Sequence, residues 1–170
     1  MKKVAIALVV LLAGCREDQA SVAPDPVAMT DDALGHFCQM ALSEMTGPKA
    51  QIFLDGQPFP IFFAQARDGI AYLKEPEKTA GILAFYVSDM SHATSWDDPG
   101  ADNWIAAKDA HFVVGADIKG GMGAPELVPF GDLSDARAFA ASNGGLVMGL
   151  DSIPEDAVLG GVDFDSNEGS

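Results

Sequence analysis

The sequence has few basic residues for its length. Lys and Arg number 10 against 25 Asp and Glu, which gives a net charge of −15 at pH 7. A surface this acidic repels nucleic acids and anionic lipid headgroups, and it favours solubility or a basic partner. We therefore expect no nucleic-acid partner.

The sequence also lacks an apolar run at its start that is long enough to cross a bilayer. The run over residues 4–13 is far shorter than the ~20 residues that a membrane-spanning helix needs. It follows Lys2 and Lys3 and leads into Leu12-Ala13-Gly14-Cys15, the small-residue pattern of a lipoprotein signal peptide. We expect cleavage before Cys15 and diacylglycerol on its sulfur.

This leader sets the expected domain plan. Residues 1–14 are the signal peptide, 15–30 a flexible linker, 31–158 the folded domain and 159–170 an acidic disordered tail. Removal of the leader takes away two lysines and no acid, so the net charge moves from −15 to −17. The lipid places the domain at a membrane surface in the periplasm, and Arg16 after the cysteine favours the outer membrane over the inner one.

Within the predicted domain, one order of elements occurs twice. The first series is a strand at 50–54, a turn at Asp55-Gly56, a return strand at 59–63, a helical face formed by Phe63, Ala66, Ile70 and Leu73, and a strand at 82–87. Pro58 and Pro60 place the return strand at a sheet edge, and Pro76 limits the helix.

The second series repeats this order. It has strands at 111–114 and 126–130 joined by a Gly-rich connection, a helix through Leu133, Ala136 and Phe139 with Asp132 or Ser134 as N-cap, and a strand at 146–150. The fold class is therefore α+β, with two tandem ββαβ units that share a core in one compact domain.

Cys38 is the residue around which the functional hypothesis is built. With Cys15 acylated, Cys38 has no partner for an intramolecular disulfide. Met40 lies two positions on, where side chains share a face if the backbone is extended. A thiolate and a thioether on one side of an extended or turn segment are soft ligands, which select Cu(I) over hard cations. A buried inert thiol and an intermolecular disulfide are the alternatives.

Two sulfur atoms leave the ligand set incomplete. Met122 is a long apolar side chain flanked by glycines, which is poorly placed for a core and well placed to reach a metal; the alternative is a methionine without a role on a loop. His36, two residues before Cys38, is the competing third ligand. The metal sits within one chain or between two copies in a homodimer. Weaker claims belong to Met45, Met90, His92, His111 and Met148.

Several segments taken together resemble the NosL family of copper-binding accessory lipoproteins of nitrous oxide reductase. They are the lipobox, Cys38-Gln39-Met40, the Asp55-Gly56 hairpin with following aromatics, Tyr86-Val87-Ser88-Asp89, Asn103-Trp104-Ile105-Ala106-Ala107, Gly121-Met122-Gly123, Val128-Pro129-Phe130 and residues 140–145. The resemblance runs from Cys15 to about Leu150.

The resemblance implies a periplasmic Cu(I) chaperone. It implies delivery of copper for the copper-sulfide centre of nitrous oxide reductase in denitrification, with that enzyme and its membrane-associated maturation machinery, a NosD-type protein with an ABC transporter, as partners. It also implies two ββαβ units, a fold similar to part of organomercurial lyase. Its ligands correspond to Cys38, Met40 and Met122. One departure is Gln39, where family members often carry glycine; in an extended segment its side chain points away from the metal.

A thiol-dependent enzyme, acting in redox or organometal chemistry through Cys38, is the alternative function. Such a nucleophile needs a base with an orienting partner, or a second thiol. His36 or His111 can serve as the base, but the sequence shows no Asn or Asp partner for either. We therefore expect a binding protein and not an enzyme.

Overall fold

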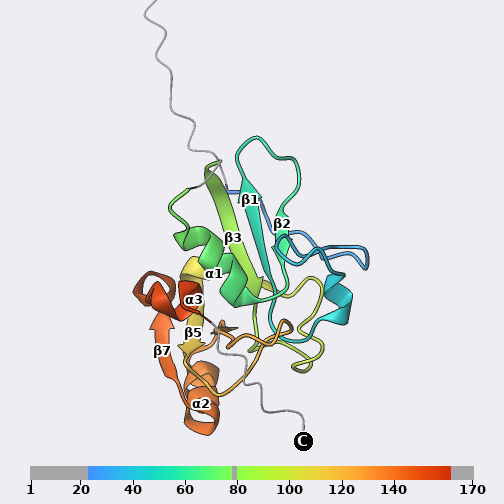
Figure 1. Ribbon diagram of the computed structural model, residues 1–170. Helices are drawn as coiled ribbons and strands as arrows, with labels where there is room; N and C mark the ends of the chain where they lie inside the picture. Colours follow the sequence, from blue (N-terminus) through green and yellow to red (C-terminus); the bar gives the residue numbers. More distant parts are fainter. Residues whose placement is uncertain (1–22, 78–79, 162–170) are drawn as a thin grey trace, which may run out of the picture.

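The computed structural model describes residues 23–77 and 80–161. Figure 1 shows two groups of strands stacked end to end, each with a helix beside it. The elements in chain order are η1 (Leu42–Glu44), β1 (Ala50–Leu54), β2 (Ile61–Phe63), α1 (Ala66–Lys74), β3 (Ile82–Ser88), β4 (Trp104–Ala106), η2 (Ala107–Asp109), β5 (His111–Val114), β6 (Val128–Phe130), α2 (Leu133–Asn143), β7 (Leu146–Gly149), η3 (Leu150–Ser152) and α3 (Asp156–Leu159).

The first sheet has the strand order β2-β1-β3-β4, and its named strand pairs are antiparallel. β2 is an edge strand, as the two prolines before it predict, but it begins at Ile61 and not at residue 59, because Pro58 and Pro60 cannot donate to the ladder. Phe63 pairs with Ala50 in this sheet, so the expected helical face starts only at Ala66. The edge position of β2 matters for the site, because it leaves one side of that strand free.

The second sheet has the order β6-β5-β7, again antiparallel. The first three strands of the other sheet follow the same order, β2-β1-β3, so the predicted pair of ββαβ units is confirmed. β6 starts at Val128, two residues later than expected, and β4 and α3 are additions that the repeat did not predict. Among the described residues, no helix is long and apolar enough to span a membrane.

One hydrophobic core joins the two units. Fully buried side chains from both sheets and from α1 meet in it, among them Ile52, Phe63, Ile70, Val87 and Phe112. The next residue of β5, Val113, belongs to a second cluster with Ala136 of α2. Because neighbouring side chains of a strand point to opposite faces, β5 contributes to both clusters and ties α2 to the shared core.

Both predicted ends of the domain move outward in the structure. Within the expected linker, the Val27 amide donates to Gln51 Oε1 over 3.1 Å, and the Tyr86 hydroxyl donates to the Pro24 carbonyl over 2.6 Å. At the other end, Leu159 belongs to α3, and Arg67 donates to the Gly160 carbonyl. The linker therefore ends earlier, and the tail starts later, than predicted; the rest of both segments lies outside the described residues, as do the signal peptide and Cys15.

The carboxyl group of Glu126 connects the units at one buried point. Its Oε1 accepts the Arg67 amide in the first turn of α1 and the Leu127 amide, both over 2.9 Å. The first amides of a helix have no partner within the helix, so this side chain from the second unit caps α1. Burial, opposed by these hydrogen bonds, raises the pKa of Glu126 to about 8 from its ordinary 4.5.

Because Glu126 is buried, its ionisation contributes a pH dependence to the free energy of unfolding. The raised pKa means that the folded chain holds the Glu126 proton more tightly, so its stability contribution is complete below about pH 4.5 and is lost as the pH rises through about 8. Glu126→Gln cannot lose that proton. We expect the free energy of unfolding of Glu126→Gln, relative to wild type, to increase between pH 5 and pH 8.5 in urea titrations. Glu44→Gln, exposed on η1, is the charge-matched control, and a difference that does not vary with pH would contradict this prediction.

Candidate metal centre

A loop over residues 34–41 carries Cys38 and is attached to the free edge of β2. Its ends form an antiparallel bridge between Leu34 and Ala41, and Gly35 bridges to Phe62 in parallel. The His36 amide donates to the Phe62 carbonyl over 2.7 Å. The edge of β2 that is not paired with β1 therefore holds the loop that presents the thiol.

The loop is a tight turn, which is one of the two backbone forms, extended or turn, expected for Cys38 and Met40. The Gln39 amide donates to the Gly35 carbonyl over 2.8 Å, and the Gly35 amide donates to the Met40 carbonyl over 3.0 Å. Gln39 has φ of 56°, in the left-handed region. The i, i+2 rule for an extended strand therefore does not apply to Cys38 and Met40.

Cys38 is half-buried on the inner side of this turn. Its side chain packs against a small cluster formed by Ala33, Leu42 and Ala64. A Cβ at Gly35 would come within 2.5 Å of Cys38 Sγ, closer than a real Cβ contact. The missing side chain at Gly35 thus makes room for the thiol.

Met122 lies at the tip of a second tight turn. The Gly123 amide donates to the Gly120 carbonyl over 2.8 Å, and the Gly120 amide donates to the Ala124 carbonyl over 2.9 Å. A Cβ at Gly120 would overlap the side chains of Gln65 and Glu126. The turn is therefore seated closely on the buried carboxyl group, while the Met122 side chain remains 37% exposed.

Cys38 and Met122 line the same cleft, of about 420 Å³. The chain between them passes through the whole first unit and β5, the first strand of the second, so it is the packing of the two units that brings these sulfur residues together. The other residues that line the cleft are Phe37, Gln65, Arg67, Asp68, Ala71, Ala124, Val158 and Gly160. An open cleft with a thiol and a thioether in its walls has the soft donors that Cu(I) prefers.

The floor of the cleft is polar and buried. Arg67 is 6% exposed, and its Nη2 donates to the carbonyls of Val158 and Gly160 over 3.2 and 3.3 Å. Gln65 Nε2 donates to the Ala124 carbonyl over 3.3 Å, at the base of the Met122 turn. These two side chains join the start of α1 to the Met122 turn and to α3.

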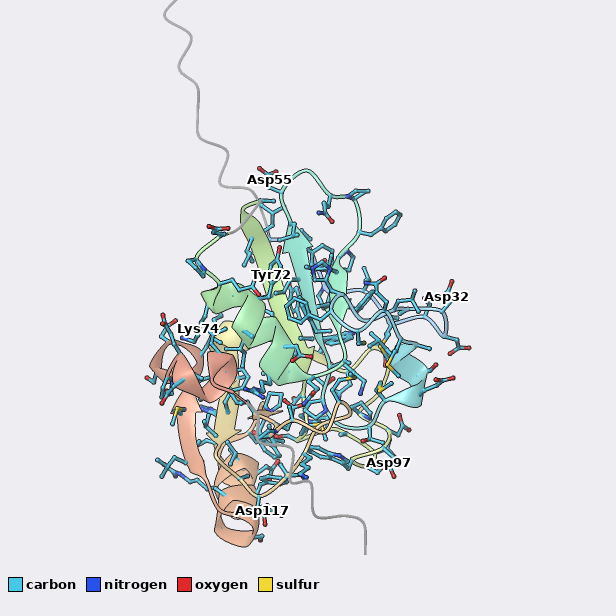
Figure 2. All side chains as sticks on the ribbon, in the orientation of Figure 1. Asp32, Asp55, Tyr72, Lys74, Asp97 and Asp117 are labelled. Atoms are coloured by element: carbon cyan, nitrogen blue, oxygen red, sulfur yellow. The ribbon has the colours of Figure 1, made fainter. Side chains whose placement is uncertain are left out.

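Met40 and His36, the other two predicted ligands, do not line this cleft. Met40 is 43% exposed on the same loop. The His36 ring packs against Phe63 and Tyr72, with ring centroids 5.6 Å away in each case, and Tyr72 is labelled on α1 in Figure 2. His36 and Gln39 line a separate hollow beside β2.

The residues with weaker claims lie elsewhere. Met45 lines a hollow with Met29 beside the loop of Asp97, labelled in Figure 2. His92 Nδ1 lies 2.8 Å from Asp89 Oδ2, which raises the pKa of His92. His111 and Met148 are in β5 and β7. Across residues 23–77 and 80–161, no three His, Cys, Asp or Glu side chains gather as a metal site.

Sequence reasoning missed the polar floor of the cleft. Gln65 and Arg67 stand at the start of a helix, where polar residues usually face solvent, and Glu126 lies directly before a strand. The sequence contained one signal of this floor: an acidic residue stands between the Gly-rich turn and an apolar run. It did not reveal that the acid is completely buried beneath Gly120.

Comparison with known proteins places the chain in a family. The family model described as NosL matches residues 26–158. A "Copper-binding lipoprotein NosL" from Achromobacter cycloclastes is 51% identical over 162 residues, which cover 94% of this chain and 83% of the relative. The protein of the same name from Stutzerimonas stutzeri is 32% identical over 152 residues, 89% of this chain and 78% of the relative.

Solved structures agree with this placement. The crystal structure of the copper chaperone NosL from Shewanella denitrificans has a TM-score of 0.71 at 31% identity and covers 76% of this chain and 95% of that one. The solution NMR structure of apo-NosL from A. cycloclastes has a TM-score of 0.50 at 49% identity and covers 71% and 94%. The chain belongs to the NosL family.

Proposed function

We propose that this protein is a membrane-anchored copper chaperone of the periplasm that holds Cu(I) in the cleft between Cys38 and Met122. The observation that carries the proposal is that a half-buried thiol and an exposed thioether, 84 positions apart in the sequence, line one cleft. The names of the relatives, a copper-binding lipoprotein and a copper chaperone, support it. Neither name is that of an enzyme, so the thiol-dependent enzyme is not favoured.

In the proposed site, the Cys38 thiolate is the anionic anchor. Met122 supplies a thioether from the opposite wall of the cleft. Met40 lies on the Cys38 loop, outside the cleft, and joins the metal through movement of that loop. His36 is the competing ligand, but it must first leave its packing against Tyr72. Copper then leaves by ligand exchange, as a ligand from the partner replaces one thioether at a time.

The proposed route of the copper follows from the family. We propose transfer to nitrous oxide reductase through its membrane-associated maturation machinery, with the lipid on Cys15 anchoring the chaperone, in the outer membrane by preference. The acidic surface of the chain favours a basic docking face on the partner. Cells that produce Cys38→Ser should yield nitrous oxide reductase without the absorbance of its copper-sulfide centre, whereas normal absorbance would contradict this route.

Loss of the thiolate should abolish tight binding. Cys38→Ser replaces the only soft anion of the proposed site with a hard hydroxyl, so we expect Cu(I) affinity to fall at least about 100-fold. An anaerobic titration against a competing Cu(I) chelator measures this. Equal affinity of Cys38→Ser and wild type would overturn the assignment.

Loss of the thioether should weaken binding without abolishing it. Met122→Leu keeps the apolar bulk and removes the sulfur, and we expect affinity to fall about tenfold, or ~1.4 kcal/mol of binding free energy. X-ray absorption of the copper-loaded protein should show one sulfur fewer. Met148→Leu, in β7 on the second sheet, is the matched control and should bind as wild type does.

The same measurements separate Met40 from His36. If Met40 is the third ligand, Met40→Leu loses a sulfur from the absorption spectrum and His36→Ala leaves it unchanged. If His36 is the third ligand, His36→Ala removes the imidazole scattering. A spectrum unchanged in Met122→Leu would remove Met122 from the site.

A further inference from the structure

Gln39 has a backbone conformation that its residue type rarely adopts. Across residues 23–77 and 80–161, it is the only residue other than glycine with a positive φ, at 56°. The left-handed region brings the Cβ of an L-residue too close to the following carbonyl, so single residues persist there only where the surroundings hold them. The strained residue lies between the two sulfur residues of the Cys38 loop.

The Gln39 side chain supplies part of what holds it. Its Nε2 donates to the His36 carbonyl over 2.8 Å and to the Gly35 carbonyl over 3.3 Å. Its backbone amide donates to the same Gly35 carbonyl over 2.8 Å. Cys38 therefore sits in a closed turn in which Gln39 is bound back to Gly35 and His36, through both its main chain and its side chain.

The two halves of the turn differ in how they are packed. His36 and Phe37 pack against Phe63 and Tyr72 of the shared core, whereas the Cys38 side chain packs against the separate cluster of Ala33, Leu42 and Ala64. Segments outside the main core open at lower free-energy cost than the core itself, so residues 38–40 can open locally while the two rings stay in place. Whether the turn is closed or open then determines how far the half-buried Cys38 thiol is exposed to solvent.

We propose that Gln39 is a positioning residue: its amide keeps the Cys38–Met40 turn closed and so limits how fast Cys38 exchanges its ligand. This inference rests on the proposed copper function, with Cu(I) as the ligand. Gln39 lines the hollow beside β2 and not the cleft, so it acts through the backbone of the turn. The side-chain amide thus sets a rate and does not bind the metal.

The test uses the full chain with Cys15→Ala, so that Cys38 is the only thiol. Gln39→Glu keeps the shape but faces two carbonyl oxygens with a carboxylate, and Gln39→Ala removes the amide. Gln57→Glu adds the same charge at an exposed residue of the β1–β2 loop and is the control. Each protein without copper is reacted with 4,4′-dithiodipyridine, which measures the reaction rate of Cys38. Each copper-loaded protein is mixed with excess Cu(I) chelator, which measures the rate of copper release.

We expect both Gln39 variants to react at Cys38 about fivefold faster than wild type, as the loss of one hydrogen bond implies. We expect copper release to rise by a similar factor, with an unchanged midpoint of thermal unfolding. Gln57→Glu should match wild type in all three. Gln39→Gly lacks the amide but adopts a positive φ without strain, so it should fold and react no faster than Gln39→Ala.

Equal Cys38 reaction rates in wild type, Gln39→Glu and Gln39→Ala would overturn the proposal. A lower unfolding midpoint with unchanged rates would also overturn it, because it would show a role in stability alone. Copper binding and the thiol reaction test different claims. A wild-type protein that binds no copper would overturn the proposed copper function. The reaction rate of Cys38 would still decide whether Gln39 keeps the turn closed.

Discussion

The buried carboxyl group of Glu126 is the point on which the rest of the site depends. It caps the first turn of α1 through the Arg67 amide, and it lies directly beneath Gly120, where the Met122 turn begins. One wall of the cleft is thereby fixed to the other. A protein interior transmits small shifts because it is closely packed, so the position of the Met122 turn relative to α1 follows from how this group is held.

The two sulfur residues are supported differently. The Met122 turn rests on Gln65 and Glu126, both fully buried, and a Cβ at Gly121 would come within 2.8 Å of the Thr46 carbonyl. Backbone hydrogen bonds attach the Cys38 loop to an edge strand. A fixed thioether and a thiol on a loop that can open suit a protein that must hold copper and also release it.

The sequence predicted the elements whose pattern is local. Alternation and turn chemistry located β1, β3, β5, α1 and α2, and the repeated order predicted two equivalent sheets. β4 is three residues long with partly buried side chains, too short for a periodic signal. The cleft floor could not be predicted, because the burial of Gln65, Arg67 and Glu126 results from contacts about 60 positions apart.

The site prediction shows the same division at finer scale. Residue types singled out Cys38 and Met122 as candidate ligands, and both line one cleft. The spacing of Cys38 and Met40 suggested an extended or turn segment, and the structure has a turn there. The resemblance implies that family members often carry glycine where this chain has Gln39. Such a glycine would fit the backbone found here, because glycine adopts a positive φ without strain. A glutamine in that position needs a compensating contact. The hydrogen bond from its side-chain amide to the His36 carbonyl is that contact. The departure from the family pattern therefore affects the backbone of the Cys38 turn, and Cys38, Met40 and Met122 stay in the chain as the proposed ligands.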